Sequence, residues 1–210
     1  GRELCRVLSP LGTLISTTRH SDSVCFLDLA NTANIASLVN RVRPAIVINA
    51  AAYTAVDKAE TDEKTATIVN GSAVEALAEA CHQASAMLIH YSTDYVFDGS
   101  TRRAYKESDS VNPLSVYGRS KQQGEDAVLS SAIAHLILRT GWVYAGHGAN
   151  FVLTMQRLAR GDGPIRVVSD QFGTPTWARS LAQITGHVVA RALDRGPTWL
   201  MERRGLYHVC

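Results

Sequence analysis

The chain has 210 residues, of which 46% are hydrophobic and 19% are charged, and its formal net charge is +2. This length suits one globular domain with a substantial core, and the apolar fraction excludes a disordered chain. The nearly balanced charge, without a run of basic residues, predicts no nucleic-acid partner. No apolar run approaches the roughly 18 residues of a membrane span, so no membrane association is predicted.

The residues that bind metals or form disulfides are scattered. No CxxC spacing joins the four cysteines, which are Cys5, Cys25, Cys81 and Cys210. This pattern predicts neither a zinc site nor a disulfide framework, and it fits a reducing, cytoplasmic location. The seven histidines form no HExxH pair, so no metal site is predicted. His90 and His135, which flank predicted strands, are expected to be packing or surface residues.

Short apolar runs alternate with helical patterns along the chain. The runs predict strands at residues 14–16, 45–49, 87–91, 136–139 and 165–168. Apolar residues at helical spacing predict helices over 35–42, 69–80, 116–132, 150–159 and 178–193. This alternation indicates βαβ units, and therefore an α/β fold with a doubly wound, Rossmann-like parallel sheet. Ligands of such sheets bind beyond the carboxyl ends of the strands, so the residues that follow each strand are the first candidates.

One such strand end is followed by a tyrosine and a lysine. Tyr117 and Lys121 are four residues apart, so they share one face of the predicted helix. An ammonium beside a phenol favours the phenolate and lowers the tyrosine pKa, which would make Tyr117 a proton donor or acceptor near neutral pH. A YxxxK pattern alone also arises by chance in a helix. With Thr93 at the end of the predicted strand 87–91, however, the set resembles the catalytic arrangement of short-chain dehydrogenases/reductases.

Longer segments resemble one family within that group, the dTDP-4-dehydrorhamnose reductases. They are VINAAAYTAVDKAE at 47–60, HYSTDYVFDG at 90–99, NPLSVYG at 112–118, RTGWVY at 139–144 and DQFGTPT at 170–176. The resemblance extends over residues 1–208. It implies reduction of the C4 ketone of dTDP-4-dehydro-L-rhamnose by NADPH, with NADH as an alternative cofactor and a homodimer as a candidate assembly.

The resemblance also implies roles for individual residues. Tyr117 would protonate the C4 oxygen, Lys121 would tune Tyr117 and contact the nicotinamide ribose, and Thr93 would hydrogen-bond the ketone. Asp94 and Trp142 would contact the sugar. The implied cofactor-binding residues are Thr18, Arg19, Asp28, Leu29, Ala51, Ala52, Tyr53, Thr54 and Tyr91, together with Tyr117 and Lys121. Arg19 favours NADPH because it can pair with a 2′-phosphate, although it can equally be a solvated arginine.

The chain departs from the family pattern at both ends. The family's first strand and glycine-rich turn have no counterpart before Gly1, and the family's closing C-terminal segments have none after His208. We therefore expect a partial NADP-binding Rossmann domain at residues 1–145 and a partial sugar-nucleotide region at 146–210. We also expect that the chain alone binds cofactor poorly.

Three other functions stay open at this point. The chain could reduce another nucleotide-linked 4-ketosugar. It could be a non-catalytic subunit like the regulatory relatives that bind methionine adenosyltransferase, although the complete set of Thr93, Tyr117 and Lys121 favours catalysis. An epimerase or dehydratase of the same superfamily is a third reading, but a dehydratase usually carries an Asp-Glu pair where this chain has Asp94 and Tyr95.

Overall fold

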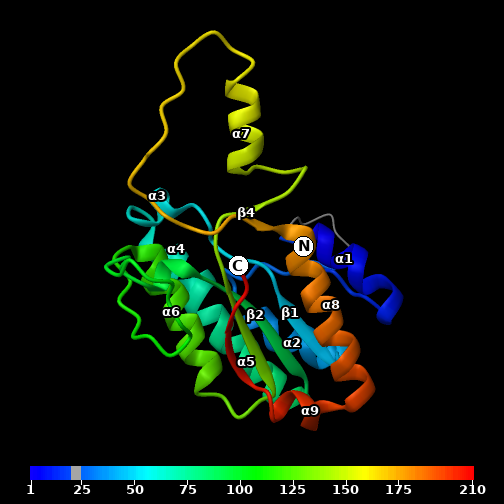
Figure 1. The fold of residues 1–210 in the computed structure, drawn as a ribbon. Helices are drawn as coiled ribbons and strands as arrows, with labels where there is room; N and C mark the ends of the chain where they lie inside the picture. The colour runs from blue at the N-terminus through cyan, green and yellow to red at the C-terminus, as the bar shows by residue number, and fades with distance from the viewer. Residues whose placement is uncertain (20–24) are drawn as a thin grey trace.

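A four-stranded parallel sheet forms the centre of the molecule (Figure 1). The computed structural model describes residues 1–19 and 25–210. The strand order is β1-β2-β3-β6, with β1 at Ile46–Asn49, β2 at Met87–Thr93, β3 at His135–Thr140 and β6 at Gly205–His208. Every residue of β3 is buried, and all but one of β2, as in a parallel sheet that is covered on both faces. The predicted doubly wound α/β class is confirmed.

Alternate side chains of the strands enter two separate cores, because successive residues of a strand point to opposite faces. Ile89 and Leu138 lie on the face covered by α1 (Arg2–Leu8), α8 (Ala178–Arg195) and α9 (Pro197–Met201). Leu88 and Ile137 lie on the face covered by α5 (Ala73–Ala84) and α6 (Val116–Leu129), and α2 (Ala33–Val42) packs beside α5. The face on which a strand residue lies thus decides which helix it meets.

Shorter elements complete the body. They are η1 (Ser9–Leu11), α3 (Val56–Ala59), α4 (Glu63–Thr67), the π-helical turn η2 (Ile68–Ser72) and η3 (Asp94–Val96). The π turn η2 leads directly into α5, so the helix predicted from residue 69 begins with widened geometry. The helix predicted to reach residue 132 ends earlier, at Leu129.

A long excursion leaves the body after β3. Two short strands, β4 (Val143–Tyr144) and β5 (Thr176–Trp177), pair in parallel at its base. Between them, α7 (Phe151–Leu158) and the chain that follows it reach away from the sheet (Figure 1). No residue of α7 is buried, whereas α8 returns to pack on α1. The division of the chain into two regions at residue 145 stays a prediction.

Two predicted strands do not form. Leu14 and Ile15 are 42% and 49% exposed, and the backbone near them makes only one isolated bridge, between Thr18 and Phe26. Val168, in the run 165–168, is 65% exposed and lies on the excursion. A strand needs a neighbour for its backbone N–H and C=O groups, and neither run has one in the described chain. Apolar composition alone misled both predictions.

No helix of the described ranges combines the length and the apolar character needed to cross a bilayer.

Candidate active site

The carboxyl end of β2 places Thr93 and Asp94 at one edge of the sheet. Thr93 ends β2 and caps η3: its Oγ1 accepts a hydrogen bond from the Tyr95 N–H at 3.2 Å and donates to Asp94 Oδ1 at 3.1 Å. Burial raises the pKa of Asp94, and the bond from Thr93 opposes that shift. The strand end therefore presents an oriented hydroxyl beside a partly desolvated carboxyl group.

The start of α6 brings Tyr117 to this strand end. The side chain of Ser115 caps the helix by accepting the Gly118 N–H at 3.0 Å. A Cβ on Gly118 would stand 2.3 Å from the Tyr95 carbonyl oxygen, so only glycine lets the helix begin this close to η3. The Tyr117 ring then meets the Tyr95 ring edge-on, with centroids 5.6 Å apart. Tyr117 and Thr93, far apart in sequence, thus face the same point.

The charge state of Tyr117 differs from the sequence prediction. Burial raises its pKa to about 12, a hydrogen bond with Thr93 opposes the rise, and the charge of Asp94 adds to it. The prediction that Lys121 lowers this pKa is wrong for the protein without ligands, because burial dominates it and the Lys121 amine is directed at Tyr91 and His90 instead. At neutral pH, Tyr117 is a protonated phenol, which is the form of an acid rather than of a base.

Lys121 is buried and directed at β2. Lys121 is 1% exposed. Its Nζ donates to the Tyr91 carbonyl oxygen at 2.6 Å and lies 3.2 Å from His90 Nε2. Burial lowers the pKa of Lys121 to about 8, and the nearby carboxylate of Glu125 opposes the shift. The predicted positions of Tyr117 and Lys121 on one face of α6 are correct, but the lysine meets the strand backbone.

Further polar side chains line the same face of the sheet. His90 is fully buried, and its Nδ1 accepts a hydrogen bond at 3.1 Å from the side-chain amide of Asn49, its register partner on β1. Arg139 of β3 donates to Glu125 of α6 through Nε at 2.8 Å and through Nη2. Burial, aided by the neighbouring Lys121, lowers the pKa of His90 well below its ordinary value, so the imidazole is neutral.

The residues expected at the cofactor begin where β1 ends. Ala51 and Thr54 are exposed, and Ala52 and Tyr53 are half-buried. The buried Asn70 of η2 fixes this loop, because it accepts the Tyr53 N–H at 2.8 Å and donates to the Tyr53 carbonyl at 3.0 Å. The small side chains leave the backbone accessible, as an approaching ligand would require.

A second expected cofactor group is also assembled. Thr18 and Leu27 run side by side, with the Leu27 N–H donating to the Thr18 carbonyl at 2.9 Å. This places the exposed Arg19 near the segment of Asp28 and Leu29. The Asp28 carboxylate accepts the Ala30 N–H at 2.9 Å, whereas the Leu29 side chain packs against the core between α2 and α5. Leu29 can therefore offer a ligand little more than its backbone.

The expected sugar contacts lie beside Thr93. A Cβ on Gly141, just after β3, would stand 2.3 Å from Asp94 Oδ2, so Asp94 abuts the residue that precedes Trp142. The Trp142 indole is 43% exposed, and Gly173 lies against one part of it. Trp142, the residue after Gly141, thus offers a partly exposed aromatic ring. Tyr91, expected near the nicotinamide, hydrogen-bonds the Thr185 hydroxyl of α8 instead of an open site.

A cationic cleft of about 590 Å³ lies where α1, β5 and the excursion meet. Its lining comprises Arg2, Glu3, Arg6, Gly146, His147, Trp177 and Arg179. Arg179 lies over the Trp177 ring at 5.1 Å and, with His147, holds Glu3. Arginine guanidiniums suit phosphate oxygens, so this cleft can hold the phosphates of a nucleotide. Across residues 1–19 and 25–210, no group of three or more His, Cys, Asp and Glu side chains is arranged to hold a metal.

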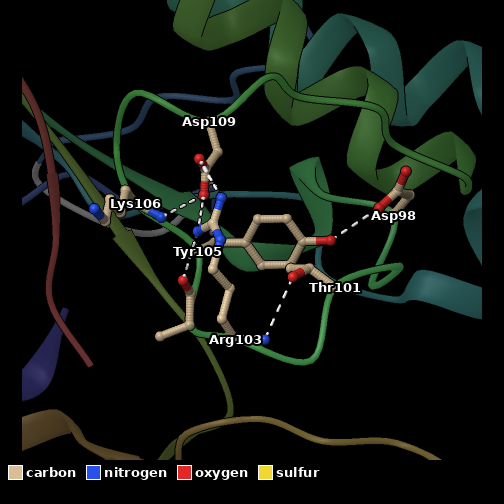
Figure 2. A network of polar contacts seen from close by, with 7 residues as sticks. Asp98, Thr101, Arg103, Tyr105, Lys106 and Asp109 are labelled. Atoms are coloured by element: carbon tan, nitrogen blue, oxygen red, sulfur yellow. Dashed lines mark hydrogen bonds and ion pairs between the residues drawn. The ribbon is translucent and has the colours of Figure 1, made fainter.

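An ordered loop joins the two halves of the site, from Phe97 after η3 to Ser115 before α6. Figure 2 shows its polar network: Asp109 accepts two bonds from Arg103, at 2.7 and 2.8 Å, and one from the Lys106 N–H. Asp98 accepts the Tyr105 hydroxyl at 2.8 Å. Hydrogen bonds from Asn112, Ser100 and Tyr105 lower the pKa of Asp98, and those from Arg103 and Lys106 lower the pKa of Asp109. The network cross-links residues 98–109 of the loop between Thr93 and Tyr117.

Comparison with known proteins identifies the family. The model of the RmlD substrate binding domain matches residues 1–210. The chain belongs to the RmlD substrate-binding family. It is 46% identical over 209 residues to dTDP-4-dehydrorhamnose reductase of Escherichia coli K12, which covers all of this chain and 68% of that protein. It is 42% identical over 185 residues to dTDP-4-keto-6-deoxy-D-glucose reductase of Streptomyces niveus, covering 87% of this chain and 62% of that protein.

A solved structure within the family agrees. The dTDP-4-dehydrorhamnose reductase of Bacillus anthracis in complex with NADP has a TM-score of 0.78 and 36% identity, covering 87% of this chain and 62% of that one. The Rossmann-like reductase fold expected from the resemblance is therefore shown, and so is the predicted family. The chain spans about two thirds of the length of these relatives.

Three residues around the site escaped the sequence analysis: Asn49, Glu125 and Arg139. His90 was predicted to be a packing or surface residue; it is fully buried, and it also contacts Lys121. A signal was present, because a polar residue at every second position of an otherwise apolar strand marks one face of the sheet. Glu125 lies one helical turn beyond Lys121, on the same face of α6.

Proposed function

We propose that this chain carries the catalytic centre of an NADPH-dependent reductase that converts dTDP-4-dehydro-L-rhamnose to dTDP-L-rhamnose. The observation that carries the proposal is the meeting of a protonated, buried Tyr117 with the Thr93 hydroxyl at the carboxyl end of β2. Ketone reduction needs a proton donor at the carbonyl oxygen, and a phenol that keeps its proton at neutral pH meets that need.

The residues divide the reaction as follows. As hydride arrives at C4, the bond from carbon to oxygen becomes single, and the oxygen takes the proton of Tyr117. Thr93 donates a hydrogen bond to that oxygen while negative charge develops on it. Asp94 and Trp142 hold the sugar, the carboxyl group by hydrogen bonds and the indole by apolar contact. Lys121 contacts the nicotinamide ribose and supplies positive charge near the phenol when it is protonated.

The described residues fit the cofactor. NADPH, when bound, supplies the hydride. Arg2, Arg6 and Arg179 offer guanidiniums to its phosphates, and the exposed backbone at Ala51 lies beyond β1, as ligands of parallel sheets require. The buried hydroxyl of Thr140, in register with Thr93, has no hydrogen-bond partner within the described chain, so a ligand at this edge would complete its bonding. NADH serves as an alternative, as the NAD complexes of related proteins suggest.

The dTDP-sugar is the proposed partner, and a homodimer and a cytoplasmic location belong to the same proposal. The scattered cysteines support a reducing compartment.

The experiment uses the protein expressed from the whole gene that encodes this chain. Loss of NADPH absorbance is followed with dTDP-4-dehydro-L-rhamnose for wild type, Tyr117→Phe and the matched control Tyr207→Phe, whose hydroxyl donates to the Arg203 carbonyl. We expect Tyr117→Phe to lose about 10²- to 10⁴-fold in kcat with NADPH binding retained. Equal activity of Tyr117→Phe and wild type contradicts the assigned acid. NADPH binding without oxidation by the wild type would instead favour the regulatory-subunit alternative.

A second 4-ketosugar is the main alternative substrate. The Streptomyces niveus relative is named for dTDP-4-keto-6-deoxy-D-glucose, so the same assay is run with that compound. A higher kcat/KM for that compound than for dTDP-4-dehydro-L-rhamnose would identify it as the preferred substrate of the proposed reductase.

A further inference from the structure

Lys121, His90 and Asn49 form a continuous buried chain of polar groups between α6 and β1. The Lys121 Nζ lies 3.2 Å from His90 Nε2, and His90 Nδ1 lies 3.1 Å from Asn49 Nδ2. Asn49 Oδ1 accepts the Ala51 N–H at 3.3 Å, at the start of the loop expected to meet the cofactor. His90 is 0% exposed, Lys121 1% and Asn49 5%, so water cannot readily replace the two contacts of the His90 ring.

The donors in this chain fix the state of the imidazole. Because Asn49 Oδ1 is engaged by Ala51, the Asn49 amide N–H donates to His90 Nδ1. A neutral imidazole that accepts at Nδ1 carries its proton on Nε2, which then points at Lys121. An ammonium has three donors and no lone pair, so it cannot accept that proton's hydrogen bond. The arrangement is complementary only when Lys121 is a neutral amine.

A charged Lys121 requires the opposite arrangement. The ammonium would donate to a lone pair on His90 Nε2, the His90 proton would move to Nδ1, and the Asn49 amide would rotate so that its oxygen accepts that proton. Asn49 would then no longer accept the Ala51 N–H. In the charged state, the group that loses its partner within the chain is the Ala51 N–H.

We propose that Asn49 and His90 are positioning residues for Lys121, and that they tie its charge to the His90 tautomer and to the availability of the Ala51 N–H. The proposal deepens the proposed reductase function, because it concerns the lysine of that same site. When Lys121 is charged, the Ala51 N–H is free to donate to a ligand that lies against the loop after β1. Binding at that loop and protonation of Lys121 therefore favour each other.

Other charged groups near Lys121 are few. On α6 itself, Glu125 opposes the effect of burial, and Arg139 of β3 reaches Lys121 only through its ion pair with Glu125. Asp94 and Tyr95 of η3 act on Tyr117. Strand β1 and turn η2 present the neutral amides of Asn49 and Asn70. The acidic and basic side chains of α3, α4 and α5 are exposed, namely Asp57, Lys58, Glu63, Lys64, Glu75, Glu79 and His82.

Nuclear magnetic resonance of the protein without ligands tests the proposal directly. The chain has four lysines, at 58, 64, 106 and 121, so the Lys121 Cε signal can be assigned by loss in Lys121→Met. The pH titration of that signal is compared with the ¹⁵N shifts of the His90 ring, which report the tautomer, and with the Ala51 amide signal. We expect the three to change with one common midpoint. A His90 tautomer that stays constant while Lys121 titrates overturns the proposal without any variant.

Variants give a second, independent readout. In His90→Gln, the amide oxygen can accept from the ammonium in place of the imidazole. The charged lysine then has an acceptor without the tautomer change that the imidazole requires, and we expect the Lys121 midpoint to rise by about one pH unit or more. The matched control is His135→Gln, because His135 is also a buried strand histidine but bonds to the Ile133 carbonyl. An equal Lys121 midpoint in both variants and in wild type refutes the coupling.

These measurements need no substrate, so their failure is distinguishable from failure of the reductase assay. If Tyr117→Phe loses reductase activity but the His90 tautomer stays constant, the proposed reductase function is supported and the coupling of Lys121 to His90 is refuted.

Discussion

The ion pair between Glu125 and Arg139 allows a sharp test of how the α6 face is stabilised. Their side chains are 2% and 5% exposed, and Arg139 donates to the carboxylate through both Nε and Nη2. Replacing one partner, in Glu125→Leu or Arg139→Met, leaves the other charge buried and uncompensated. Such a change costs about 3–5 kcal/mol of the free energy of unfolding. That is a large part of the roughly 5–15 kcal/mol of a typical domain.

The double variant is expected to behave differently. Replacement of a whole buried pair by apolar residues is often close to neutral, because the desolvation cost of both charges disappears. Arg139 also has one buried N–H group, Nη1, without a partner among the described residues, and the double variant removes that cost too. Against this stands the loss of the Arg139 contact over the Phe97 ring at 4.9 Å, about 1 kcal/mol. The double variant should therefore unfold within about 2 kcal/mol of wild type.

Urea unfolding followed by circular dichroism measures all four proteins. We expect a coupling free energy above about 3 kcal/mol between the two changes. Costs that simply add in the double variant would refute it. The control pair is Arg103 and Asp109, which has the same two-bond geometry but an Arg103 side chain that is 57% exposed. Water screens that pair, so we expect a much smaller coupling there.

Three further predictions concern Gly124, Lys121, and the pair of Asp98 and Asp109. Gly124→Ala should destabilise the fold strongly, since its Cβ would stand 2.2 Å from the Asn70 carbonyl oxygen. Gly146→Ala should not, because a Cβ there meets open space. The midpoints of urea unfolding compare the two variants. Lys121 has a pKa of about 8 in the folded protein and near 10.5 in the unfolded chain, so the unfolded chain binds more protons between these two pH values. The free energy of unfolding of wild type should therefore rise relative to that of Lys121→Met as the pH goes from about 7.5 to about 9.5. Parallel curves of stability against pH for the two proteins would contradict this. The pKa values of Asp98 and Asp109 are lowered in the folded protein, so the stability that the two carboxylates contribute is complete above the ordinary aspartate pKa near 3.9 and is lost as the pH falls through their pKa values in the folded state. The double variant Asp98→Asn and Asp109→Asn should therefore lose less of its urea midpoint at acidic pH than wild type does.

The sequence predicted the elements that carry their own signal. Strands such as Met87–Thr93 are continuous apolar runs, and helices such as Ala33–Val42 show apolar residues at helical spacing with a stop at Pro44. The strand predictions at 14–16 and 165–168 were wrong because a strand depends on a neighbour that local composition does not reveal. The π turn at Ile68–Ser72 was missed for a related reason. Its residue Asn70 bonds to Tyr53 and Ser120, which are contacts from other parts of the chain that local sequence does not reveal.

The candidate site was predicted in part. The positions of Thr93, Tyr117 and Lys121 at one strand end follow from order along the chain and from the rule for parallel sheets. The direction of the Tyr117 pKa did not follow, since spacing along a helix says which residues share a face but not where a lysine amine finds its partners. Lys121 found them at Tyr91 and His90, which lie on another element. Burial then dominates the pKa of both the phenol and the amine.

One face of α6 unites these results. Tyr117, Lys121 and Glu125 follow one another at one-turn intervals, and each meets a different partner: Thr93 at the end of β2, His90 within β2, and Arg139 of β3. The helix is thus oriented by a buried ion pair at one end and presents its acid at the other. Glu125 also raises the pKa of Lys121, so the same carboxylate that stabilises the helix acts on the charge at its centre. Removing Glu125 should consequently lower both the free energy of unfolding and the Lys121 midpoint, whereas a purely structural ion pair would change only the first.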